Sequence, residues 1–86
     1  MHTVIVFQDA LAAARRLGYR IRQEWLAEVG GGPCEFGGQR WLFIDLSQTA
    51  AEQLEEVLHV LRTDPASSSL DLSPVLRRLC ESRRAA

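Results

Sequence analysis

Glu55, Glu56 and His59 are the residues whose types and spacing come closest to a catalytic site. They lie in the segment EEVLH, within a stretch whose leucines and valines recur at helical spacing. On a helix, Glu55 and His59 share one face a turn apart and could bind a metal ion, while Glu56 could activate water. No third metal ligand follows His59 in the sequence in a recognisable setting. We therefore favour an ion pair between Glu55 and His59 on a solvated face, worth about 0.2–0.5 kcal/mol, and predict no catalytic or metal-binding residue.

The two cysteines, Cys34 and Cys80, do not have the spacing of a metal knuckle or a redox C-x-x-C pair. The N-terminal segment MHTVIVF lacks the features of an export signal, so we expect a cytoplasmic protein. Cytosolic thiols are kept reduced. Both cysteines are therefore expected to be buried, reduced and structural.

The glycine-rich segment GGGPCEFGG could be a phosphate-binding loop or a hairpin. Gly32 and Gly37 have the spacing of a phosphate loop, but Gly38 and Gln39 stand where lysine and a hydroxyl residue are needed. An apolar strand follows instead of a helix start, and such a loop needs the helix. We therefore predict a hairpin with its turn at Gly37-Gly38, and no cofactor.

The elements that position these residues follow from periodicity and capping signals. Alternation predicts the strands, while Gly18, the Thr49–Glu52 capping box and Ser73-Pro74 mark helix ends. The segment 4–7 fits helix or strand, and we favour helix. The predicted elements are a helix over 9–18, strands over 19–26, 34–36 and 39–46, a helix over 49–63, and a helix over 73–84.

These elements predict an α+β fold in one domain, residues 1–86, with a flexible polar linker near 64–72. We expect a three-stranded antiparallel meander with two or three helices packed on it, in the order α-β-β-β-α-α. The chain has 86 residues and a net charge of -1, and no segment has the length of an apolar membrane span. We expect no membrane association.

The surroundings of the EEVLH segment resemble those in small zinc-peptidase domains of bacterial stress and phage-immunity regulators. A strand ending in Asp45-Leu46 is followed by a short polar turn and then the helix, with Glu55 in place of the first histidine of H-E-x-x-H. The resemblance implies an alternative function, a metal-dependent hydrolase or its inactive descendant, using Glu55, Glu56 and His59.

A longer pattern resembles a group of small uncharacterised bacterial proteins. It consists of GGxCxxxG, then WLFIDLS, E-Q-L-E and S-P-V-L-R-R-L, and the similarity runs from about Leu17 to Glu81. It implies a stand-alone domain and no particular chemistry.

The order of one helix, three strands and a helix also matches the double-stranded-RNA-binding domain, which gives a second alternative. Such domains grip phosphates with basic residues. Here the second helix starts SQTAAEQLEE, without a basic residue before Arg62. The charge pattern argues against nucleic acid as a partner.

The strand over 40–46 is apolar on both sides, with Trp41 and Phe43 opposite the leucines and isoleucine. Helices on one side of a small sheet would leave the other side open, and exposed aromatic patches mark interaction sites. We predict a non-enzymatic interaction or regulatory module, with a homodimer contact or a docking face for another protein centred on Trp41 and Phe43 and joined by Trp25. The rival expectation is that the helix over 73–84 covers this face.

Overall fold

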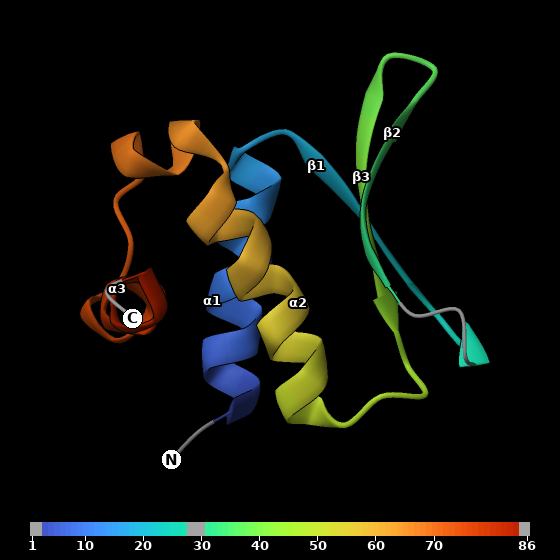
Figure 1. Ribbon diagram of the computed structural model, residues 1–86, viewed down its shortest axis with the longest axis horizontal. Helices are drawn as coiled ribbons and strands as arrows, with labels where there is room; N and C mark the ends of the chain where they lie inside the picture. Colours follow the sequence, from blue (N-terminus) through green and yellow to red (C-terminus); the bar gives the residue numbers. More distant parts are fainter. Residues whose placement is uncertain (1–2, 28–30, 85–86) are drawn as a thin grey trace.

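The computed structural model describes residues 3–27 and 31–84 and shows an α+β fold. In Figure 1, two helices lie on one side of a sheet and a third helix lies beyond them. The elements in chain order are α1 (Thr3–Arg16), β1 (Tyr19–Glu24), β2 (Gly32–Phe36), β3 (Gln39–Asp45), α2 (Ala50–Thr63), the 3-10 helix η2 (Pro65–Ser69) and α3 (Pro74–Arg84). No described helix is both long and apolar enough to cross a membrane.

The sheet is mixed, so the predicted antiparallel meander is wrong. The strand order is β1-β3-β2, with β1 parallel to β3 and β2 antiparallel to β3. A central strand must hydrogen-bond along both edges, and Pro33 removes a donor from β2, so β2 is suited to an edge. The apolar β3 takes the centre, where both of its edges are paired.

Local signals placed the starts of α2 and α3 and the hairpin turn correctly. Thr49 and Glu52 form the predicted capping box at the start of α2. Gly37 and Gly38 have φ angles of 59° and 75°, which a tight two-residue hairpin turn requires. The amide of Leu76 donates to the Ser73 hydroxyl, which caps α3. The segment 4–7 is helical, as favoured from the sequence, and α1 begins at Thr3, before the predicted range of 9–18.

The core lies between the helix layer and one face of the sheet. Leu42 and Ile44 of β3 point into it and are fully buried. Small residues on α1 allow close approach to α2, because alanine adds little bulk between two helices. The other buried core residues are Ala10, Leu11, Ala13, Ala14, Val57, Leu58, Val60, Leu61, Leu76 and Cys80. α3 packs on α2 and α1, and contributes the last two of these.

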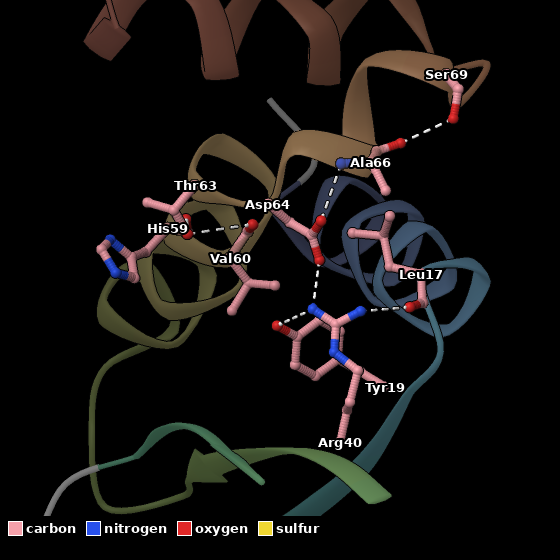
Figure 2. A network of polar contacts seen from close by, with 9 residues as sticks. All are labelled: Leu17, Tyr19, Arg40, His59, Val60, Thr63, Asp64, Ala66 and Ser69. Carbon is pink, nitrogen blue, oxygen red and sulfur yellow. Dashed lines mark hydrogen bonds and ion pairs between the residues drawn. The ribbon is translucent and has the colours of Figure 1, made fainter.

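A polar network joins the sheet to the ends of two helices (Figure 2). Arg40 of β3 donates to the carbonyl of Leu17 at 2.9 Å, to the Tyr19 hydroxyl at 2.8 Å and to the Asp64 carboxylate at 2.5 Å. Asp64 also accepts from the amide of Ala66 at 2.9 Å, which starts η2. The segment 64–72, expected to be a flexible polar linker, thus contains a capped 3-10 helix.

Candidate partner-docking face

Three aromatic side chains form a row on the sheet face that points away from α1 and α2. Residues paired across β2 and β3 share a face, so Cys34 and Phe36 of β2 lie on the same side as Trp41 and Phe43 of β3. Phe36 and Trp41 stack with ring centroids 5.8 Å apart, and Trp41 and Phe43 stack at 6.1 Å. Sequence alternation alone placed Trp41 and Phe43 together, and the structure brings them into contact.

β1 adds charged side chains to this side of the sheet. The parallel register pairs Arg20 with Trp41 and Arg22 with Phe43. The Arg20 guanidinium carbon lies 5.8 Å from the centroid of the Trp41 ring, within range of a cation–π contact. Arg22 forms an ion pair with Glu24 two residues along the strand. We call Arg20, Phe36, Trp41 and Phe43 the aromatic face.

No described helix covers the aromatic face. α1 and α2 pack on the opposite side of the sheet, and α3 packs on those two helices (Figure 1). The rival expectation that the C-terminal helix covers this face is therefore wrong. Phe36 is 55% exposed, while Trp41 and Phe43 are half-buried.

Trp25 does not join the row, contrary to the prediction. It directly follows β1, after Glu24, and so lies outside the register that pairs β1 with β3. Its side chain is 72% exposed, and it makes no ring contact with the aromatic face in the part of the chain that the structure describes.

Cys34 also departs from the prediction, because it is exposed on the edge strand β2 while Cys80 is buried. An edge strand with an uncovered face gives a small apolar side chain nothing to pack under. No disulfide joins the two cysteines.

The residues of the EEVLH segment do not converge. Glu55 binds Arg62 at 3.1 Å, and the predicted pair with His59 does not form. Arg62 also donates to the carbonyl of Leu79 at 3.3 Å, so this contact ties α2 to α3. His59 is exposed and points away from the network of Figure 2. Among residues 3–27 and 31–84, no three histidine, cysteine, aspartate or glutamate side chains gather where they could hold a metal ion.

Sequence reasoning missed Phe36 and Arg20. The position of Phe36 could have been predicted from the sequence. A two-residue turn at Gly37-Gly38 pairs Phe36 with Gln39, and Gln39 lies on the same face of β3 as Trp41. The position of Arg20 depends on the parallel pairing of β1 with β3, for which the sequence carries no local signal.

Comparisons with family models, with curated proteins and with solved structures found no match to this chain.

Proposed function

We propose that this chain is a cytoplasmic, non-enzymatic interaction module that binds a partner protein on the aromatic face. The observation that carries the proposal is the row of Phe36, Trp41 and Phe43 on a sheet face that none of the described helices covers. Aromatic and arginine side chains are enriched where binding energy concentrates in protein interfaces. The two cysteines form no disulfide with each other, which agrees with a reducing compartment.

The charges beside the row indicate which kind of partner surface would fit the aromatic face. Arg20 lies over one side of Trp41, and Arg22 and Glu24 form the polar rim on β1. A complementary surface would present an apolar centre to the rings and a carboxylate to Arg20. A base-stacking surface for single-stranded nucleic acid would need a basic groove along the backbone. Of the two arginines beside the row, Arg22 is already paired with Glu24, and the net charge of the chain is -1. These charges favour a protein partner over a nucleic acid.

The test uses capture from the native cell extract, followed by calorimetry with the identified partner. Phe36→Lys places a charge in the row at its most exposed ring and should weaken binding by about tenfold or more. Val75→Lys is the matched control, since Val75 is 50% exposed on α3, away from the sheet. It should bind as the wild type does.

The fluorescence of Trp41 gives a second readout. In the Trp25→Phe variant Trp41 is the sole tryptophan, so partner binding should protect its emission from a soluble quencher. A partner that binds Phe36→Lys as tightly as the wild type and leaves Trp41 open to the quencher would rule out this face.

A further inference from the structure

The outer edge of β1 is a second surface without a partner in the described residues. β3 occupies only one edge of β1. The amide of Leu46 donates to the carbonyl of Glu24 at 2.9 Å, so the backbone of Glu24 points toward β3. Backbone groups alternate sides along a strand, and those of Ile21 and Gln23 therefore point outward. Such a row of amides and carbonyls is a template for another strand.

We propose that β1 pairs antiparallel with β1 of a second copy of this chain, about a twofold axis that passes through Gln23. The two three-stranded sheets then form one six-stranded sheet. A twofold axis perpendicular to the sheet keeps the helices of both copies on one side and both aromatic faces on the other. This proposal does not depend on the function proposed for the aromatic face.

The charges of β1 select this register. An axis at Ile21 would place Arg20 opposite Arg22 of the second copy, and an axis at Arg22 would place that residue opposite itself. Like charges directly opposite are destabilising. An axis at Gln23 places Arg22 opposite Glu24 of the second copy, and the twofold repeats this pair. The ion pair now formed within one chain would become an alternating cluster of four charges.

The same register gives a role to Trp25, which the aromatic face does not use. If the pairing continues one residue past the end of β1 at Glu24, residue 25 lies opposite Ile21 of the second copy. The 72% exposed ring of Trp25 would lie on Ile21 of the second copy, which is only half-buried in one chain. Tryptophan supplies much of the binding energy in many interfaces.

The edge suits a second copy better than the aromatic face does. Stacking two copies face to face would take Arg20, Arg22 and Glu24 out of water, and removing charges from water is costly. Pairing at the edge leaves these side chains in contact with solvent and satisfies the backbone groups of Ile21 and Gln23.

Sedimentation velocity at high micromolar concentration tests the register through charge reversal. The wild type should dimerise. Arg22→Glu alone and Glu24→Arg alone each place like charges opposite, and each should raise the dimer dissociation constant by about tenfold or more. Mixing the two single variants should give a heterodimer, because glutamates then face arginines. The double variant Arg22→Glu/Glu24→Arg should regain the homodimer, which a general loss of stability would not allow.

Cross-linking tests the axis. In a Cys34→Ser background, Gln23→Cys places two thiols opposite each other at about 5.5 Å between Cα atoms, a separation that a disulfide spans. Oxidation should give a covalent dimer. Arg20→Cys is the control, since the two copies of that position would lie about 20 Å apart along the strands.

A wild type that stays monomeric would overturn the proposal. So would a dimer that is unaffected by charge reversal and lost in Phe36→Lys, since the second copy would then lie on the aromatic face. Loss of partner capture by Phe36→Lys with an intact dimer would leave both proposals standing.

Discussion

Arg40 lies on the helix-covered side of β3, two residues before the buried Leu42, and three acceptors meet its guanidinium group. Two of these acceptors belong to the C-terminal ends of helices, the carbonyl of Leu17 after α1 and the carboxylate of Asp64 after α2. A cation at such ends complements the helix dipole. The Arg40 side chain therefore fixes the sheet to both helices.

The first prediction concerns Asp64, whose side chain is only 8% exposed. The hydrogen bond from Arg40, supported by the amide of Ala66, holds the pKa of Asp64 below its usual range. A carboxyl whose folded pKa is lowered stabilises the fold above its unfolded pKa of about 3.9, and the contribution is lost as the pH falls through the folded pKa. Asp64→Asn should lower the free energy of unfolding at pH 7 by about 1–2 kcal/mol, since the exposed part of Arg40 is screened by water.

Urea unfolding of both proteins between pH 7 and about pH 2 checks this, since the wild type should lose its advantage over Asp64→Asn as Asp64 is protonated. Asp71→Asn is the control, because Asp71 is exposed in the segment before α3. A constant difference between wild type and Asp64→Asn over the whole pH range would contradict the ionic contribution.

At the scale of elements, the turn and capping signals were sufficient to place the hairpin turn and the helix starts, because they act between residues that are neighbours in the chain. Gly37-Gly38, Thr49 and Ser73 were each placed from the sequence. The strand that pairs with β1 could not be predicted in this way. β1 pairs in parallel with β3, which follows β2 in the chain, and Pro33 keeps β2 out of the central position of the sheet. Alternation fixed which residues share a face, but not which strand lies beside which.

The second prediction tests the pairing of β2 with β3 through Gly31. A Cβ atom there would lie 2.3 Å from the carbonyl oxygen of Phe43 and 3.2 Å from the amide nitrogen of Asp45. Backbone atoms of a central strand cannot move away without breaking the ladder. Gly31→Ala should therefore destabilise the protein by about 2 kcal/mol or more.

Gly38→Ala is the matched comparison for Gly31→Ala. Its Cβ would meet nothing within 4 Å, and only its positive φ of 75° opposes alanine. It should cost about 1 kcal/mol. Equal destabilisation of the two variants in urea unfolding would mean that Gly31 does not lie against β3.

At the scale of the whole molecule, the existence of the aromatic face could be predicted because the chain has one small sheet and helices that cover one side of it. Amphipathic helices on one side of a small sheet leave the other side open, and the alternation of Trp41 and Phe43 put both rings there. Trp25 was misplaced because the strand ends at Glu24 and the chain turns after it, with Ala27 at a φ of 54°. The end of a strand is set by its neighbours, which the sequence alone does not identify.

The third prediction asks whether α3 belongs to one cooperative unit with the sheet. Leu76 is 1% exposed between α3 and the other helices, while its neighbour Val75 is exposed. Leu76→Ala removes buried contacts and leaves a cavity, so it should cost about 2–4 kcal/mol, whereas Val75→Ala should change stability by about 0.5 kcal/mol or less.

Two probes of the urea unfolding of Leu76→Ala distinguish the possible arrangements. Trp41 fluorescence in a Trp25→Phe background reports on the sheet, and far-ultraviolet circular dichroism reports mainly on the helices. If α3 stabilises the sheet through α1 and α2, Leu76→Ala shifts both midpoints by the same amount. A fluorescence midpoint that stays in place while the helical signal shifts would show that α3 unfolds by itself. α3 would then not help to hold the sheet in the shape that presents the aromatic face.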